Sequence, residues 1–349
     1  MTKTNIHLAD FLLEKQAEKP LICLLLAIAD ICTNIAEMTA KGALANITEK
    51  LQSQNIQGET QTQLDVITND LMIEGLSKCE VVAGLVSEEM DDVINIRAAQ
   101  YLVAFDPLDG SSNVAVNVSV GTIFSVLNAP ENRMPTESDY LQAGSSQVAA
   151  GYALYGPATM LVLTIGKGTH GFTLDLATKT FVLTHRSMQV AETTSEFAIN
   201  ASNERFWEAP IERYVGECKA GAAGVRGRDF NMRWVASMVA DVHRILLRGG
   251  IYLYPRDSKK PIKAGRLRLM YEASPTSFLV EQAGGESSTG NMRVMDIVPD
   301  SVHQRVPLII GTAQEVSLVK RYTQTFDSGD AQKGFSPLFG ERSLFHKKQ

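Results

Sequence analysis

The chain has 349 residues, of which 44% are hydrophobic and 21% are charged, and its formal net charge is −6. This composition is typical of a globular protein with a sizeable core. A net negative chain lacks the basic surface by which proteins hold nucleic acid, so that class of partner is excluded. The cysteines (Cys23, Cys32, Cys79 and Cys218) form no CxxC pair, so we expect small buried side chains in a reducing compartment rather than a zinc site.

Helices are predicted first along the chain. The apolar pattern favours an amphipathic helix over residues 6–19 and a longer one over 21–41. In the second, the apolar run 21–29 ends at Asp30 and falls short of the roughly 18 residues that a membrane span needs. The charges before it are mixed, which is not typical of a signal peptide, so we expect a buried helix and a cytoplasmic protein. Residues 58–75 are predicted to be a loop leading into a helix.

Strands begin near residue 79. Short apolar runs bounded by acidic or turn residues predict strands at 81–86, 101–105, 114–120, 122–127, 151–155 and 160–165. A turn is expected at 168–171. Later segments predict helices at 233–247 and 274–282 and strands at 250–254 and 306–310. Strands and helices without regular βαβ alternation predict a layered α+β fold.

Acidic residues gather at the ends of two predicted strands. Glu88 and Glu89 follow the strand at 81–86, and the segment Asp106-Pro107-Leu108-Asp109-Gly110-Ser111-Ser112-Asn113 follows the strand at 101–105. A third acidic position is Glu272. Carboxylates at strand ends converge at one edge of a sheet, where open sheets usually hold ligands. Several hard oxygen ligands at such an edge select Mg²⁺ or Mn²⁺.

The spacing of the second cluster has a mechanical interpretation. Pro107 is expected to fix a turn that lets Asp106 and Asp109 face one ion, with the carbonyl of Leu108 between them. Gly110 permits tight turning. The amides that follow are expected to point at a phosphate, namely those of Gly110, Ser111 and Ser112. Each of these pieces alone is more often an ordinary turn, but together they favour a metal-dependent phosphatase.

These motifs closely resemble the class I fructose-1,6-bisphosphatases, within the lithium-sensitive, inositol-monophosphatase-like superfamily. The similarity covers roughly residues 8–322. The segments that carry it are 64–66, 86–89, 106–113, 120–124, 150–156, 237–244, 249–255, 267–272, 281–285 and 303–305. It implies an α/β/α/β/α sandwich of the sugar-phosphatase type. It also implies an N-terminal lobe (1–190) with metal-binding loops and a C-terminal lobe (191–349) with the sugar-phosphate pocket and an extended tail.

The resemblance also implies roles for individual residues. The metal ligands would be the side chains of Glu88, Asp106, Asp109 and Glu272 and the carbonyl of Leu108. Asp65, together with Glu89, would deprotonate the attacking water, and Glu59 would be an acidic loop residue that also reaches the metals. The implied reaction is hydrolysis of the 1-phosphate of fructose 1,6-bisphosphate to fructose 6-phosphate, by Mg²⁺-activated water, in gluconeogenesis or the Calvin cycle.

The far phosphate of the substrate requires a second pocket. The resemblance builds it from Asn200, Tyr254, Arg266 and an Arg233 that reaches over from a neighbouring subunit of a homotetramer. Members of the family commonly have lysine at position 266 and tyrosine at positions 203 and 234, where this chain has Arg266, Asn203 and Trp234. These departures leave sedoheptulose 1,7-bisphosphate open as an alternative substrate. A non-catalytic sugar-phosphate sensor is the less favoured reading, because the acidic residues are intact.

This chain departs further from the family pattern at a regulatory site. Many members bind the inhibitor AMP beside the first helices, through small hydroxyl residues, a lysine-tyrosine pair and an arginine. Here the first stretch is 17–20 (Ala-Glu-Lys-Pro), the lysine position is Gln100 beside Tyr101, and the arginine position is Asn128. We therefore expect no inhibition by AMP through that site.

Overall fold

The computed structural model describes residues 5–45, 50–54 and 60–328. Its α-helices are α1 (Leu8–Glu14), α2 (Lys19–Lys41), α3 (Gln63–Lys78), α4 (Glu137–Tyr140), α5 (Ala209–Lys219), α6 (Met238–Arg248), α7 (Ser274–Gln282) and α8 (Ala313–Asp327). Two shorter helical segments bear on the site: the 3₁₀ helix η2 (Ser111–Val116) and the π-helix η6 (Leu269–Ala273).

Most of the first half of the chain forms one mixed sheet of eight strands, in the order β10-β9-β8-β7-β6-β5-β3-β4. The strands are β3 (Val82–Ser87), β4 (Ile94–Asn95), β5 (Tyr101–Asp109), β6 (Val120–Asn128), β7 (Ala149–Tyr155), β8 (Thr159–Thr164), β9 (Thr169–Asp175) and β10 (Thr180–Met188). Within this sheet β3 and β5 are parallel, and the other neighbours are antiparallel.

The second half forms a sheet of five strands, in the order β12-β11-β13-β17-β15. These strands are β11 (Glu196–Ile199), β12 (Asn231–Met232), β13 (Ile251–Tyr254), β15 (Glu286–Ser288) and β17 (Leu308–Gly311). Two small antiparallel pairs complete the described strands: β1 (Lys50–Gln54) with β2 (Thr60–Thr62), and β14 (Leu267–Arg268) with β16 (Arg305–Val306).

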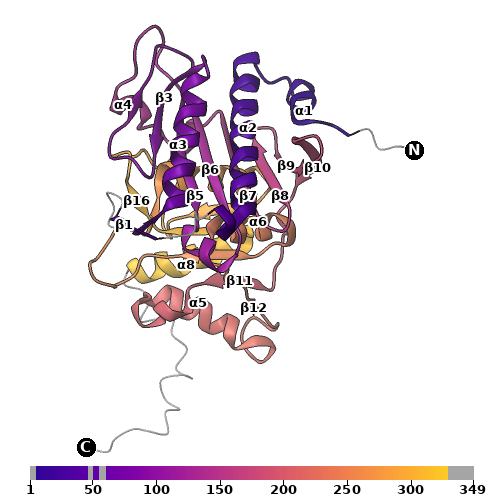
Figure 1. Cartoon of the computed structure of the whole chain (residues 1–349). Helices are drawn as coiled ribbons and strands as arrows, with labels where there is room; N and C mark the ends of the chain where they lie inside the picture. Colours follow the sequence, from indigo (N-terminus) through magenta and orange to yellow (C-terminus); the bar gives the residue numbers. More distant parts are fainter. Residues whose placement is uncertain (1–4, 46–49, 55–59, 329–349) are drawn as a thin grey trace, which may run out of the picture.

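Side chains that alternate along the strands divide the core into layers. On β6, Phe124 packs with α1, α2 and α3 on one face of the large sheet, and Ile123 packs with α6 and α7 on the other. On β13, Tyr252 faces α6 and α7, whereas Leu253 faces α5 and α8. The order of layers is therefore helices, eight-stranded sheet, helices, five-stranded sheet, helices, which confirms the expected α/β/α/β/α sandwich (Figure 1).

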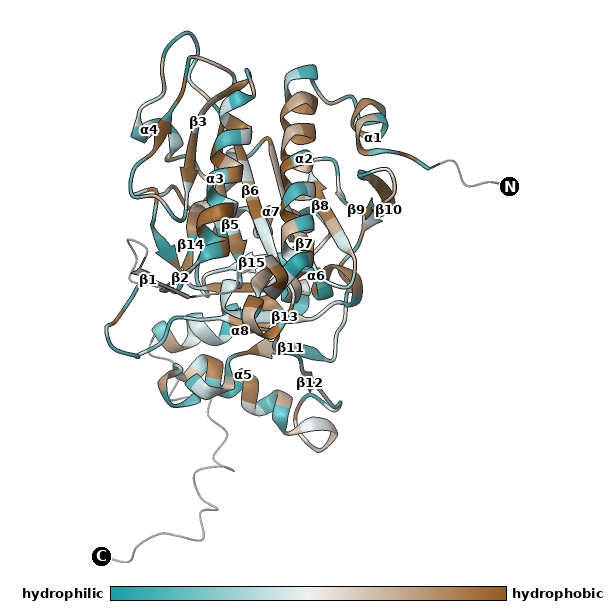
Figure 2. Cartoon of the chain, in the orientation of Figure 1, coloured by the Kyte–Doolittle hydropathy of each residue, from teal (hydrophilic) through white to brown (hydrophobic). Residues whose placement is uncertain are grey.

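Helix α2 is a core helix of the outermost layer. It has 23 residues and is long and apolar enough to cross a membrane by length and composition alone, so the argument that its apolar run is too short was wrong. Its residues Leu24, Ile28, Cys32 and Ile35 are nevertheless fully enclosed against the large sheet. Figure 2 shows the corresponding mixture of hydrophobic and hydrophilic residues along the helix, which is typical of a helix with one buried face.

The four cysteines, all within the described ranges, are free thiols. Cys32, Cys79 and Cys218 are buried, as expected for small apolar side chains. Cys23 is exposed on α2, contrary to the expectation.

Several element boundaries differ from the expectation for physical reasons. β5 continues through Pro107 to Asp109 instead of ending at residue 105. The first part of the predicted strand at 114–120 is instead the end of the 3₁₀ helix η2, and β6 begins only at Val120. Gly110 and Asn117 adopt left-handed backbone conformations that close a tight turn at each end of η2. The predicted helix at 233–247 begins at Met238, and Pro307 separates β16 from β17 in the predicted strand at 306–310.

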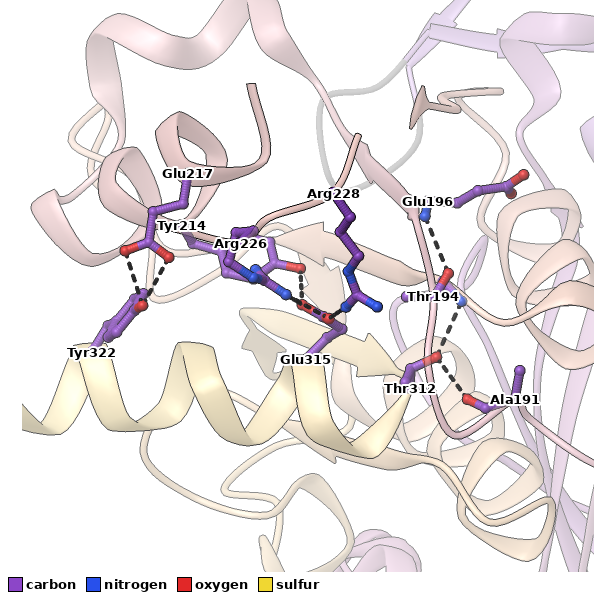
Figure 3. Close-up of polar contacts among 11 residues, drawn as sticks. Ala191, Thr194, Glu196, Tyr214, Glu217, Arg226, Arg228, Thr312, Glu315 and Tyr322 are labelled. Atoms are coloured by element: carbon purple, nitrogen blue, oxygen red, sulfur yellow. Dashed lines mark hydrogen bonds and ion pairs between the residues drawn. The ribbon is translucent and has the colours of Figure 1, made fainter. Parts of the chain in front are cut away.

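A buried ion-pair network attaches the segment before β12 to the last helix (Figure 3). Glu315, in the first turn of α8, accepts hydrogen bonds from Arg226 at 2.6 Å and Arg228 at 2.8 Å. The hydroxyl of Tyr214 on α5 donates to the same carboxylate at 2.7 Å. Glu315 is almost fully buried and the Arg226 side chain is 11% exposed, so these charges are poorly solvated and depend on one another. The network fixes the start of the chain segment that carries Arg233.

Replacing this carboxylate should destabilise the fold. Glu315→Gln leaves two guanidinium groups without their counter-charge, and we expect the free energy of unfolding to fall by about 3 kcal/mol. Urea unfolding followed by circular dichroism measures the change. The matched control is Glu14→Gln, because Glu14 pairs with Arg186 at the exposed surface and its loss should leave the unfolding midpoint unchanged. A Glu315→Gln chain as stable as the parent would contradict the assigned role.

Candidate active site

The two aspartates of the 106–113 segment lie on either side of a β-bulge. Asp106 pairs with Ile123 of β6 and Asp109 pairs with Gly121, so three steps along β5 match two steps along β6. Residues three apart on a regular strand point to opposite faces, and one extra residue restores the same face. Pro107 is tolerated there because a bulge does not need its missing N–H. The expected turn at Pro107 is thus a bulge, and it brings Asp106 and Asp109 to one side.

Glu88 reaches the same place from the neighbouring strand. β3 and β5 are parallel, and their last paired residues are Ser87 and Phe105, so Glu88 and Asp106, which come directly after this pair, lie at the same edge of the sheet. The amide of Glu88 donates to the carbonyl of Phe105 at 3.1 Å. Its carboxylate is buried and in hydrogen-bonding contact with Asp106. The sheet therefore places Glu88 and Asp106 side by side.

Glu272 joins this cluster from the C-terminal half of the chain. It lies in the π-helix η6, a conformation that is rare and is found often at functional sites. Oxygen atoms of Asp106, Asp109 and Glu272 lie within 4.8 Å of one another, and all three residues are buried. Three of the predicted metal ligands therefore converge in the structure, and Glu88 lies against one of them. Leu108 is buried in the bulge, where the role of its carbonyl stays a prediction.

A buried arginine, which the sequence did not single out, lies among these carboxylates. Arg268 Nη2 is 2.6 Å from Glu88 Oε1, and Arg268 Nη1 is 3.7 Å from Glu272 Oε2. The backbone amide of Arg268 also donates to Glu272 Oε2 at 2.6 Å. One positive charge against four carboxylates leaves a local excess of negative charge. Its position four residues before Glu272, one turn away, was a signal that could have revealed it.

The pKa values of both aspartates are raised by burial, and that of Asp106 also by the crowding. Burial, followed by the negative charges of Glu88, Asp109 and Glu272, raises the pKa of Asp106 well above its ordinary value. Burial also raises the pKa of Asp109, opposed by hydrogen bonds from Val239 and Ser237. Without a bound cation, the cluster therefore tends to hold protons. A divalent cation would relieve the same repulsion.

Asp109 also connects the large sheet to the helix layer behind it. Its Oδ2 accepts hydrogen bonds from the Ser237 hydroxyl at 2.9 Å and from the Val239 amide at 3.0 Å, at the N-terminus of α6. A carboxylate is stabilised at this end of a helix dipole. The position after Asp109 requires a glycine. Gly110 has φ +77°, and a Cβ there would lie 2.8 Å from the Cβ of Ser237. Helix α6 thus fixes the orientation of the bulge.

The predicted water-activating residues lie partly at this edge. Asp65 occupies the first turn of α3, where its Oδ2 accepts from the Thr62 amide at 2.6 Å, so it caps the helix. One turn further, Asn69 accepts from the Ser87 hydroxyl at 2.6 Å, which places this face of α3 beside the residue before Glu88. Glu89 is half-buried at the end of β3. Glu59 lies outside the described residues.

A histidine ties the two acidic segments together. The hydroxyl of Tyr271, beside Glu272, lies 2.8 Å from His303 Nδ1, and His303 Nε2 lies 3.1 Å from the carbonyl of Asp91. Asp91 belongs to the loop that follows Glu88 and Glu89. His303 therefore bridges the π-helix and this loop, although the sequence indicated no role for it beyond the family resemblance.

The predicted distal pocket is partly assembled. Asn200, Asn203 and Tyr254 line one small cavity of about 10 Å³, together with Asp257. Arg266 is ion-paired with Asp257 at 2.7 Å. The structure thus brings Asn200, Tyr254 and Arg266 into one region. Arg233 is exposed beside the edge strand β12 and is not among the residues lining this cavity, so its role across a subunit interface stays a prediction.

Aromatic rings connect the acidic cluster with the distal cavity. Trp234 stacks on Tyr252 with ring centroids 5.6 Å apart, and both rings lie about 6 Å from that of Tyr254. Burial raises the pKa of Tyr252, and the charges of Asp109 and Glu272 add to the effect, which places this tyrosine near the cluster. Tyr254 lines the distal cavity. The aromatic group of Trp234, Tyr252 and Tyr254 therefore adjoins the distal cavity through Tyr254.

Comparison with known proteins agrees with this geometry. The family model described as "Fructose-1-6-bisphosphatase, N-terminal domain" matches residues 2–186, and "Fructose-1-6-bisphosphatase, C-terminal domain" matches residues 190–324. The chain is 50% identical to "Fructose-1,6-bisphosphatase class 1" from Methylacidiphilum infernorum (isolate V4), with 99% of each chain covered. The crystal structure of Leishmania major fructose-1,6-bisphosphatase in holo form superposes with a TM-score of 0.87 at 34% identity, covering 92% of this chain and 99% of that one. The chain belongs to the fructose-1,6-bisphosphatase family.

Proposed function

We propose that this protein hydrolyses the 1-phosphate of fructose 1,6-bisphosphate, giving fructose 6-phosphate and inorganic phosphate. The observation that carries the proposal is the convergence of Asp106, Asp109 and Glu272 within 4.8 Å at the edge of the large sheet, in a member of this family. A phosphate monoester carries negative charge that a carboxylate cluster alone would repel. The cluster therefore needs cations before it can receive the substrate.

The family implies a divalent cation, and the donor set fits one. All the side-chain donors are carboxylate oxygens, which suit hard ions. Burial raises the pKa values of Asp106 and Asp109, and at Asp106 the neighbouring carboxylates raise it further. We assign the site to two or more Mg²⁺ ions, with Mn²⁺ as a substitute. Glu88, Asp106, Asp109, Glu272 and the Leu108 carbonyl would hold them. When bound, such ions neutralise phosphate oxygens and lower the pKa of a coordinated water.

The remaining residues around the cluster have distinct proposed tasks. Asp65 and Glu89 would accept the proton of the attacking water, and Glu59 would be the acidic loop residue that reaches the metals. The contact between Asn69 of α3 and Ser87 supports this, because it brings the N-terminal part of α3 to the end of β3. The amides that follow the bulge would donate to the 1-phosphate, alongside Asp109, namely those of Gly110, Ser111 and Ser112. Attack is then in line, and the sugar oxygen leaves on the opposite side.

The distal phosphate would be bound by Asn200, Tyr254, Arg266 and the partner subunit's Arg233, in a homotetramer. The exposure of Arg233 beside an edge strand supports an intersubunit role. We place the enzyme in the cytoplasm. The same reaction serves gluconeogenesis and the Calvin cycle, and the proposal covers both.

Sedoheptulose 1,7-bisphosphate is the second candidate substrate. Asn203 lines the distal cavity where the family commonly has a tyrosine, and the indole of Trp234 is stacked on Tyr252. Two phenolic hydroxyls are thus missing from the pocket, which weakens the discrimination between sugars of different length. Phosphate release from both bisphosphates and from inositol 1-phosphate, with Mg²⁺ or with EDTA, tests the proposal. A chain that binds fructose 1,6-bisphosphate but releases no phosphate would be a sensor.

Removing one ligand charge should greatly reduce the rate of turnover. For Asp109→Asn we expect kcat with Mg²⁺ to fall by about 1000-fold, equivalent to about 4 kcal/mol of transition-state stabilisation. The asparagine keeps an oxygen that accepts from Ser237 and Val239, so the fold should persist, as circular dichroism would show. Asp296→Asn, at an exposed carboxylate paired with Arg293, is the control and should be fully active. Parental rates in Asp109→Asn would refute the ligand assignment.

The stability of the metal-free protein should depend on pH through Asp106. Its pKa is raised in the folded chain, so its contribution to stability is complete below the unfolded value near 3.8 and is lost as pH rises through the raised value. Mg²⁺ replaces the proton, so the stabilisation by Mg²⁺ should grow with pH. Thermal melting in EDTA and in Mg²⁺, between about pH 5 and about pH 8, measures both trends.

Two variants separate this effect from other buried acids. Asp106→Asn should flatten the metal-free pH dependence and remove most of the Mg²⁺ response. Asp241→Asn is the control, because burial raises the pKa of Asp241 to about 6 and Arg244 is its partner. Asp241→Asn should change how steeply the melting temperature depends on pH in EDTA, and it should leave the stabilisation by Mg²⁺ intact. An undiminished Mg²⁺ response in Asp106→Asn would exclude it as a ligand.

AMP should not inhibit this enzyme through the family's regulatory site. Glu18, Gln100, Tyr101, Asn128 and Glu131 are among the residues around a cavity of about 640 Å³ beside the start of α2. None of the residues that the structure places around this cavity is lysine or arginine, and two are glutamates, which repel a phosphate. We expect unchanged steady-state rates at saturating AMP, with inorganic phosphate as a control for inhibition at the active site. Inhibition by micromolar AMP would contradict this expectation.

A further inference from the structure

The guanidinium of Arg266, which the proposed function assigns to the distal phosphate, is already bound by a carboxylate. Arg266 Nη2 donates to Asp257 Oδ1 at 2.7 Å, and Arg266 Nε donates to Asp257 Oδ2 at 3.3 Å. This two-pronged contact uses the Nε/Nη2 edge of the guanidinium, one of the edges by which arginine binds a phosphate in bidentate fashion. The Asp257 side chain is 8% exposed and that of Arg266 is 20% exposed, so solvent screens the pair only weakly.

Asp257 also forms part of the wall of the distal cavity. It lines the cavity together with Asn200, Asn203 and Tyr254. The cavity is small, with a volume of about 10 Å³, so a phosphate bound there would lie close to the residues of its wall. Asp257 is one of the residues of that wall, so it would lie near a phosphate bound in the cavity.

The backbone holds Asp257 in this position. Asp257 forms a β-bridge with Trp207, and the next amide, that of Ser258, donates to the carbonyl of Phe206 at 2.9 Å. The Asp257 Oδ1 atom also accepts from the amide of Lys259 at 3.1 Å. The carboxylate is therefore fixed by its own chain segment as well as by Arg266. A phosphate that takes Arg266 has to displace this carboxylate or tolerate its charge.

We propose that Asp257 is a specificity-determining residue that competes with the distal phosphate of the substrate for Arg266. The pair of Arg266 and Asp257 is neutral overall, Asn200 and Asn203 add no charge, and the partner subunit's Arg233 would supply the remaining positive charge. A second phosphate on the sugar thus adds less binding free energy here than it would in a pocket with a free guanidinium. This inference rests on the proposed function, because it concerns the discrimination of a sugar bisphosphate from a sugar 1-phosphate.

A carboxylate can also hold an arginine in a productive orientation, and the two roles predict opposite results. An orienting carboxylate leaves the phosphate-binding edge free and improves binding of the distal phosphate. A competing carboxylate occupies that edge and opposes the phosphate by like charge. Occupation of the Nε/Nη2 edge and the place of Asp257 in the cavity wall favour competition.

The test compares Asp257→Asn with the parent in the full-length enzyme with Mg²⁺. The readout is the ratio of kcat/KM for fructose 1,6-bisphosphate to kcat/KM for fructose 1-phosphate, which lacks the distal phosphate. We expect the ratio to rise about fivefold, through a lower KM for the bisphosphate, with unchanged values for fructose 1-phosphate. Asparagine keeps the oxygen that accepts from Lys259, and Asp257→Ser provides a second neutral variant should asparagine impair folding.

Two further variants make the result specific. Glu208→Gln is the matched control, because Glu208 pairs with Arg256 on the same segment, at 2.7 Å, outside the residues that line the cavity. It should leave the ratio unchanged. In an Arg266→Leu background, Asp257→Asn should raise the ratio less than it does in the parent, because only the like-charge repulsion remains once the arginine is gone.

Each outcome separates this inference from the proposed function. A ratio that falls in Asp257→Asn would show an orienting role, and an unchanged ratio would show no role, so either result overturns the inference while the enzyme remains a bisphosphatase. If the parent releases phosphate from neither sugar, the proposed function fails and the inference fails with it.

Discussion

The repulsion among four buried carboxylates is the constraint on which the rest of this structure depends. Glu88, Asp106, Asp109 and Glu272 cannot all carry full charge in an enclosed space unless cations or protons offset them. Arg268 supplies one positive charge, and the amides at the start of α6 supply partial positive charge to Asp109. The negative charge that these groups do not compensate remains for a divalent cation to neutralise.

The architecture serves to hold these like charges together. A parallel pair of strands brings Glu88 beside Asp106, and a bulge turns Asp109 to the same side. Glu272 arrives on a π-helix whose flanking strand β14 is paired with β16. These elements are buried and hydrogen-bonded, so the stability of the surrounding fold offsets the free energy needed to bring the carboxylates together.

Much of this could be predicted from the sequence because apolar runs followed by acidic residues mark strand ends. Asp106, Asp109 and Glu272 were assigned to one site in this way and through the family resemblance, and the structure brings them together. The bulge could not be foreseen, because Pro107 after an apolar run usually ends a strand. Asp257 carried no signal either, since an acidic residue in a polar loop is ordinarily solvated and its contact with Arg266 depends on tertiary structure.

The bond between Asp109 and the start of α6 has a consequence for how the chain is partitioned. Asp109 belongs to the segment matched by the N-terminal family model, whereas Ser237 and Val239, which hold it, belong to the segment matched by the C-terminal model. Glu88 and Arg268 are divided in the same way. Neither half contains a complete set of ligands and their supports. Each half therefore depends on the other, because either half alone would bury charges without the groups that compensate them.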